Sequence, residues 1–283
     1  MRRLTILGVF AIFLGLTPTV EAAESEFNRI SSTLYGPSGL FLTQSIDTLP
    51  PGKVEVGLGL SFLDGDNLKK EDLSVSELSS TLTVGITPNL EVSGQLPYFI
   101  DIEEGNESNS DVGDINFSLK WRLLEPSTNL NFPGFALSLT LFLPTGEPKT
   151  GAGTVDSWGL KALLVSSAET EVGTADNTVL IGFYANGGIF IQDSGDDNFE
   201  EKHGIIDLGL LIPLVESRAL QLILEGNFRI DRESRLEREY GAATLGLRYV
   251  SRHLAVNGGW QHRVNEDPLD NSNRLIIYGS YFF

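Results

Sequence analysis

The amino-acid sequence predicts an all-β protein, a transmembrane, antiparallel, up-and-down β-barrel of about twelve strands. Residues 52–283 divide into segments of about ten residues in which apolar and polar side chains alternate. Beyond the N-terminal 22 residues, no apolar run approaches the roughly 18 residues that a spanning helix needs. The last segment, Arg274 to Phe283, is an alternating aromatic strand. Soluble proteins seldom expose such an edge, whereas a barrel needs a last strand that seals against the first.

The first 22 residues have the pattern of a secretory signal peptide. Met1-Arg2-Arg3 is a basic start, residues 4–16 are almost wholly apolar, and Val20 and Ala22 are small residues placed for cleavage. The apolar run is too short to cross a bilayer, which disfavours the alternative of a membrane-anchored N-terminus. We therefore expect cleavage after Ala22 and a location in a bacterial outer membrane.

Residues 23–51 form a separate segment before the barrel at 52–283, and they are rich in Ser, Gly and Pro. The stretch Gly36 to Thr43, followed by Thr48 to Gly52, favours an extended segment and a turn. Two placements stay open at this point. The segment is either a small plug in the lumen or a lead-in from the periplasm.

The composition disfavours several classes of function. The formal net charge is -18, and loss of Arg2, Arg3 and Glu21 on cleavage makes it -19. Nucleic acid is therefore not an expected partner, because its phosphates would repel the protein. The chain has no cysteine, so it has no thiolate or disulfide chemistry. We expect a protein without enzymatic activity, cofactor or metal.

The alternation is among the clearest from Ile115 to Leu124, where Phe117 and Leu119 share one face and Ser118 and Lys120 the other. It is less regular in the sixth to eighth segments, because Leu163, Val165, Leu180 and Leu211 fall on the polar face. Counting all segments gives twelve strands, at about 52–62, 77–87, 89–99, 113–124, 133–144, 157–167, 177–191, 202–213, 217–230, 239–250, 253–264 and 273–283.

The connections between these strands alternate between long and short, as in membrane barrels with both ends in the periplasm. The long, outer connections are 63–76, 100–112, 145–156, 192–201, 231–238 and 265–272. The periplasmic turns are shortest at 88, 215–216 and 251–252, and longer around 125–132 and 168–176. Two outer loops carry clustered acid, namely Asp101, Glu103, Glu104, Glu107 and Asp111, and Asp193, Asp196, Asp197, Glu200 and Glu201. We expect them to be solvated next to outer-membrane lipid and lipopolysaccharide.

The rival architecture is a soluble β-sandwich or lipocalin-like barrel, with its polar face in water and its apolar face in a core. Periodicity alone does not separate the two architectures. The signal peptide, the terminal Phe283 and the loop asymmetry favour the membrane barrel.

Charged residues of both signs fall on the polar face, and they are the candidates for lining a lumen. Opposed charges along a narrow passage set solute selectivity. Alternatively, the charges pair across the interior and fill it, as in small barrels. Twelve strands lie between a filled eight-stranded barrel and an open sixteen-stranded porin, which favours a narrow lumen. The candidates are Glu55, Glu91, Lys120, Arg122, Lys161, Asp207, Glu225, Arg229, Arg248 and Arg263, with Arg274 on the last strand.

Two other classes of function were weighed. An outer-membrane hydrolase needs a Ser/His pair that a third polar group orients. His203 and Asp207 share a face but are separated by about 13 Å along a strand, which is too far for a hydrogen bond, and no nucleophile–base arrangement is visible. A structural or adhesive barrel would use only its surface. Aromatic residues near strand ends are expected to form interfacial girdles, namely Phe62, Tyr98, Phe99, Trp158, Phe228, Tyr249, Trp260, Tyr281 and Phe283.

Three segments resemble a family of bacterial outer-membrane transporter-like β-barrels assigned to the MetA pathway of phenol degradation. They are Val84 to Tyr98, Val112 to Leu124 and Ala136 to Gly146. The resemblance implies a channel for small, hydrophobic or aromatic solutes and no catalytic residues. The ending Tyr281-Phe282-Phe283 also resembles the terminal assembly signal that the barrel-insertion machinery reads, with Tyr281 and Phe283 in the signal positions.

Overall fold

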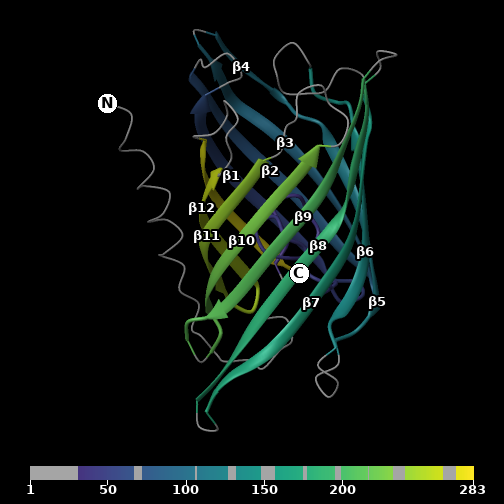
Figure 1. The fold of residues 1–283 in the computed structure, drawn as a ribbon, viewed down its shortest axis with the longest axis vertical. Helices are drawn as coiled ribbons and strands as arrows, with labels where there is room; N and C mark the ends of the chain where they lie inside the picture. Colours follow the sequence, from purple (N-terminus) through teal and green to yellow (C-terminus); the bar gives the residue numbers. More distant parts are fainter. Residues whose placement is uncertain are drawn as a thin grey trace.

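The fold is a closed, antiparallel β-barrel with no helices among the residues described (Figure 1). The computed structural model describes residues 31–66, 72–105, 107–126, 132–147, 157–174, 177–194, 199–215, 217–231, 240–263 and 272–283. The predicted signal peptide therefore lies outside the described residues. So do the acidic residues Asp196 and Asp197.

Within these described ranges, thirteen strands form one sheet, and twelve of them make up the barrel wall. β4 is the second arm of a hairpin that extends β3. The strands are β1 (Val54–Asp66), β2 (Asp72–Thr87), β3 (Leu90–Glu104), β4 (Glu107–Val112), β5 (Ile115–Leu124), β6 (Gly134–Leu143), β7 (Gly159–Thr174), β8 (Asn177–Ser194), β9 (Phe199–Pro213), β10 (Leu220–Asp231), β11 (Tyr240–Val250), β12 (Leu254–Arg263) and β13 (Asn273–Phe282).

The barrel closes between its first and last strands. β1 pairs with β13 from Glu55↔Phe282 to Asp64↔Asn273. Beyond the last pair, the Phe283 amide donates a hydrogen bond of 2.9 Å to the Val54 carbonyl oxygen. The prediction that the last strand seals against the first is therefore confirmed.

Four predicted connections are largely strand instead. β1 and β2 extend into the outer loop expected at 63–76, and β8 and β9 extend into the one expected at 192–201. The outer loop expected at 100–112 is mostly the β3–β4 hairpin, with a register shift between Phe99 and Ile102. The periplasmic turn expected at 168–176 is mostly strand, because β7 and β8 stay paired as far as Thr174↔Asn177. Pairing between strands satisfies the backbone N–H and C=O groups whatever the side chains are. Strand ends with polar side chains therefore lack the apolar alternation by which the other strands were predicted.

The outer surface of the wall is apolar, as a lipid-facing surface must be. Tyr98, Trp158 and Tyr281 of the predicted girdles lie on this surface, whereas Phe99 lines the interior instead. Exposed apolar side chains include Leu58, Leu82, Leu96, Phe117, Leu119, Trp121, Leu139, Leu164, Phe183, Ile206, Leu208, Leu245, Leu247 and Trp260.

The two rims of the barrel differ. Both described ends of the barrel sequence, Val54 and Phe283, lie at the rim where β2 and β3 are joined by two residues. We call this the periplasmic rim and the opposite one the loop rim, following the usual asymmetry of membrane barrels. Among the described residues there is no helix both long and apolar enough to cross a membrane.

Candidate functional site

The interior of the barrel holds residues 31–50, which we call the plug, and the exposed turn 51–53 joins the plug to β1. The plug folds back on itself through backbone hydrogen bonds, including Leu34 N to Phe41 O at 2.9 Å and Ser45 N to Ser38 O at 3.0 Å. Nearly all residues from 31 to 49 are buried. Of the two placements left open by the sequence, residues 31–50 therefore take the lumenal one.

One apolar cluster fixes the middle of the plug. Phe41 is 2% exposed, and its ring lies where a Cβ atom on Gly246 or Gly259 would overlap it. Glycine is therefore needed at both wall positions to admit the ring. The cluster consists of Leu34, Leu40, Phe41, Tyr184, Leu211, Ile223, Ile276 and Tyr278.

A second cluster explains the irregular alternation in the sequence. Ile46 of the plug packs against Leu163 and Val165 of β7 and Ile205 of β9. These wall residues are apolar on a generally polar face because they meet an apolar side chain rather than water. Leu211 has the same role in the first cluster. The irregularity was thus a sequence signal for a partner inside the lumen.

Charged wall residues bind the backbone of the plug. We call Glu55, Glu91, Lys120, Glu225 and Arg248 the plug seat; all five are at most 5% exposed. The carboxylates accept from plug N–H groups. Glu55 accepts from Ser32 at 2.8 Å, Glu91 from Ser38 at 2.9 Å and Leu49 at 3.0 Å, and Glu225 from Thr43 at 2.8 Å and Leu42 at 3.1 Å.

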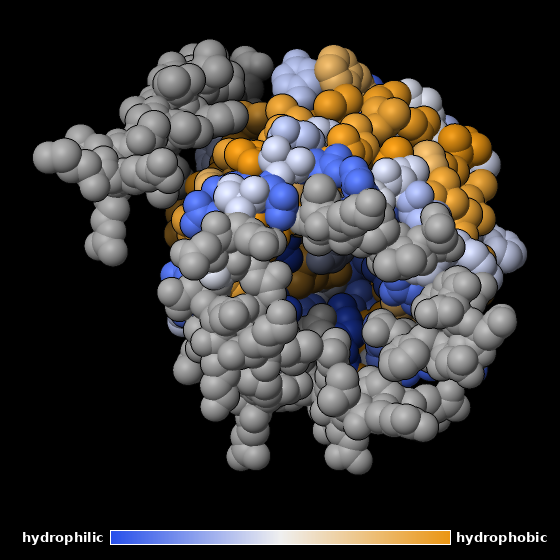
Figure 2. Space-filling view, turned by 90° about the horizontal axis from the view of Figure 1, so that it is seen from above, coloured by the Kyte–Doolittle hydropathy of each residue, from blue (hydrophilic) through white to orange (hydrophobic). Residues whose placement is uncertain are grey.

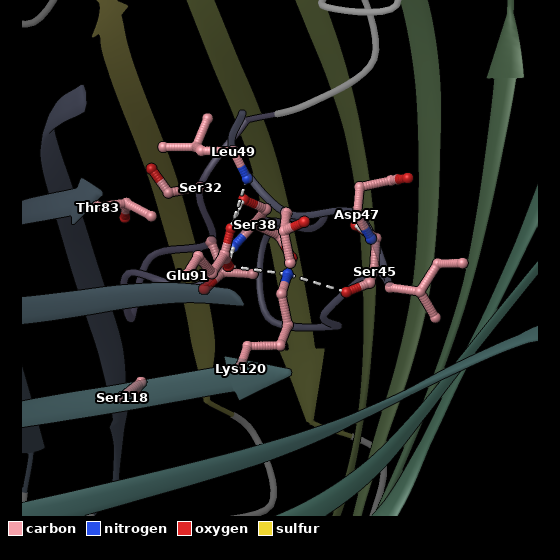
Figure 3. Close-up of polar contacts among 12 residues, drawn as sticks. Ser32, Ser38, Ser45, Asp47, Leu49, Thr83, Glu91, Ser118 and Lys120 are labelled. Atoms are coloured by element: carbon pink, nitrogen blue, oxygen red, sulfur yellow. Dashed lines mark hydrogen bonds and ion pairs between the residues drawn. The ribbon is translucent and has the colours of Figure 1, made fainter. Parts of the chain in front are cut away.

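The two cations of the plug seat bind carbonyl oxygens. Lys120 Nζ donates to Ser38 O and Ser45 O, both at 3.0 Å, and also forms an ion pair of 2.9 Å with Glu91. Figure 3 shows Glu91 and Lys120 reaching from the wall to this part of the plug. Arg248 Nη2 donates to Gly39 O at 2.7 Å. Hydrogen bonds to charged groups are about twice as strong as those between neutral groups, so these five side chains bind the plug backbone strongly.

Hydroxyl groups complete the polar contact, and the sequence reasoning did not single them out. The Tyr278 hydroxyl lies 2.7 Å from Ser32 Oγ and 2.8 Å from Thr81 Oγ1. Thr83 donates to Gly36 O at 2.7 Å. Tyr278 was missed because a tyrosine on a terminal aromatic strand reads as an interfacial residue.

The remaining lumen candidates lie elsewhere on the inner face. Arg122 sits at the periplasmic rim, where it donates to Pro88 O at 2.8 Å and Asn89 Oδ1 at 3.0 Å. Arg229 pairs with Asp207 at 2.8 Å. Lys161 Nζ lies 5.3 Å from the ring centre of Tyr35 and 5.8 Å from that of Phe142, which are cation–π contacts.

Between the plug and the loop rim lies a cavity of about 250 Å³, which we call the vestibule. Arg274 is one of the residues that line the vestibule. It donates a hydrogen bond to Ser61 Oγ at 2.8 Å and forms an ion pair with Glu77 at 3.0 Å. Viewed from the loop rim, the molecule is hollow at its centre, with hydrophilic residues in the hollow (Figure 2). The lining residues are Ser61, Leu63, Val75, Glu77, Phe99, Gln261, Arg263, Ser272 and Arg274.

The three histidines of the chain, including the hydrolase candidate His203, stack on aromatic rings. His203 stacks on Phe190 at 4.8 Å between ring centres, and His262 on Trp260 at 5.5 Å. His253 stacks on Tyr281 at 6.0 Å. These contacts give each ring a packing role.

Solved structures match the chain in fold. The COG4313 outer-membrane channel from Pseudomonas putida F1 has a TM-score of 0.61 at 13% identity, covering 84% of this chain and 98% of that one. The KdgM porin has a TM-score of 0.52 at 7% identity, covering 80% and 98%. The β domain of the Bordetella autotransporter BrkA has a TM-score of 0.50 at 11% identity, covering 81% and 98%.

These likenesses identify the fold as that of bacterial outer-membrane barrels. They include both channels and an autotransporter domain, so function has to be argued from the interior. Neither a protein-family model nor a curated protein matches the chain. The resemblance to the family of the MetA pathway therefore stays a prediction.

Proposed function

We propose that this protein is an outer-membrane channel for small solutes and that the plug holds it closed. The observation that carries the proposal is the contact between the plug and its seat. Five buried charges bind a segment that continues directly into β1 and is not part of the wall. Wall side chains fill an eight-stranded barrel, whereas the interior of this twelve-stranded barrel is occupied by a segment that is separate from the wall and can leave it.

The polar character of this contact favours release. Buried charges and N–H groups cost free energy when left without partners in a dry core, but an opened lumen fills with water that restores those partners. Several buried polar atoms here have no partner among the described residues, including Thr43 Oγ1, Glu55 Oε2 and Arg248 Nη1. Water is the usual partner of such atoms, so we expect the contact surface to be hydrated.

The resemblance found in the sequence extends the proposal to small, hydrophobic or aromatic solutes. The rings of Tyr35, Phe142 and Phe190 around Lys161 provide a surface on which such a solute can stack. The rival function is a closed structural or adhesive barrel. The many contacts between the plug and the wall fit this function if the plug never leaves the lumen.

A disulfide lock separates the two functions. Ser31 Oγ of the plug and Ser280 Oγ of β13 lie 3.5 Å apart, so Ser31→Cys/Ser280→Cys needs only a small adjustment to reach disulfide geometry. The chain has no other cysteine. We expect channel openings in planar bilayers from the reduced variant, and their loss on oxidation, because the plug is then fixed at both ends.

The matched control is Ser118→Cys/Thr140→Cys, which joins two wall strands whose hydroxyl oxygens lie 2.8 Å apart. Oxidation of this control should leave the openings unchanged. Openings that persist in the oxidised plug lock would contradict closure by the plug. No conductance from either reduced protein would favour the structural barrel.

A further inference from the structure

The plug and its seat differ in charge, and the difference has a consequence for an open channel. Residues 31–46 of the plug contain no charged side chain. All five charges of the plug seat come from the wall, and three of them are carboxylates. The seat thus carries a formal charge of three negative against two positive groups.

The two cations keep wall partners when the plug leaves. Lys120 stays paired with Glu91 at 2.9 Å. Arg248 Nε stays hydrogen-bonded to Asn257 Oδ1 at 2.6 Å. Neither interaction involves the plug. The carboxylate of Glu91 balances the charge of Lys120, whereas the neutral amide of Asn257 leaves the charge of Arg248 unbalanced, so the five seat residues together keep one net negative charge.

Two carboxylates lose their plug partners. Within the described part of the chain, Glu225 accepts hydrogen bonds from the backbone amides of Leu42 and Thr43 of the plug. Glu55 loses the amide of Ser32. The neighbouring carboxylate Asp207 is already paired with Arg229. Plug release therefore uncovers Glu55 and Glu225 on the inner face of the wall.

We propose that the plug seat becomes a binding site for small cations once the plug has left, and that it makes the open channel cation-selective. This inference rests on the proposed function. Water that enters the open lumen hydrates these carboxylates but does not cancel their charge, so they attract cations. Hydrated alkali ions and small organic ammonium ions are the expected ligands. Anions are repelled by the same two groups.

The test is a reversal potential measured on the full chain. Leu40→Ala/Phe41→Ala weakens the apolar contacts of the plug and leaves all seat charges in place. Under a KCl gradient, the current through this variant should reverse at a potential whose sign shows that K⁺ is more permeant than Cl⁻. Adding Glu225→Gln should lower the K⁺ over Cl⁻ permeability ratio by up to about thirtyfold, because one unit charge about 4 Å from an ion in water favours K⁺ about fivefold and disfavours Cl⁻ about fivefold.

Glu225→Asp is the matched control, because it keeps the charge and should keep the ratio. An open channel that prefers Cl⁻, or a ratio that Glu225→Gln leaves unchanged, would overturn the inference and leave the channel function standing. Absence of any openings in Leu40→Ala/Phe41→Ala would overturn the channel function, and the inference with it.

Discussion

Phe41 is the side chain whose removal should most directly open the channel. Its ring is 2% exposed and fills the space over Gly246 and Gly259, where the wall has no side chain that is able to move into the gap. Truncation of a buried phenylalanine to alanine costs about 3–5 kcal/mol, because apolar contacts are lost and a cavity remains. Here that cost falls on plug binding, since the wall strands are held by their own ladder of hydrogen bonds.

A loss of about 3–5 kcal/mol changes an equilibrium constant by about two to three and a half orders of magnitude. We therefore expect Phe41→Ala to raise the open probability in planar bilayers by at least about a hundredfold. The unitary conductance should stay the same, because the passage itself is unchanged. Single-channel recording measures both quantities separately.

Phe117→Ala is the matched control, because this ring is 50% exposed on the outer wall. It should leave the open probability unaltered, and heat-modified mobility in gel electrophoresis should show both variants to be folded barrels. If Phe41→Ala folds and its open probability does not rise, closure does not depend on the plug contacts described here.

Three further predictions concern the wall. Gly259→Val should raise the open probability as Phe41→Ala does, because its side chain overlaps the Phe41 ring, whereas Gly258→Val meets nothing nearby and should not. Glu91→Gln should weaken plug binding by about 3–5 kcal/mol by leaving Lys120 buried without its counter-charge, and Glu91→Gln/Lys120→Gln should cost less; a double-mutant cycle on open probability measures the difference. Deletion of Phe283 removes the hydrogen bond to Val54 and should lower the amount of assembled barrel in outer-membrane fractions, and normal assembly would contradict a role for the terminal residue.

The wall of this barrel was largely predictable because its pattern is local. Side chains of a strand point alternately to its two faces, so each segment reveals its own lipid side and lumen side. Glu55, Glu91, Lys120, Glu225 and Arg248 were accordingly expected on the inner face, and the structure places them there. Where the alternation fades, as at 168–176, the pattern no longer distinguishes a strand from a turn.

The sequence by itself determined the strands, their two faces and the closure of β13 on β1. It did not determine what the inner charges bind, because Ser31 and Ser280 or Gly39 and Arg248 meet across more than two hundred residues of chain. Only the tertiary structure places a neutral segment among those charges. A backbone amide has no sequence pattern of its own, so its pairing with a carboxylate becomes visible only when both are placed in space.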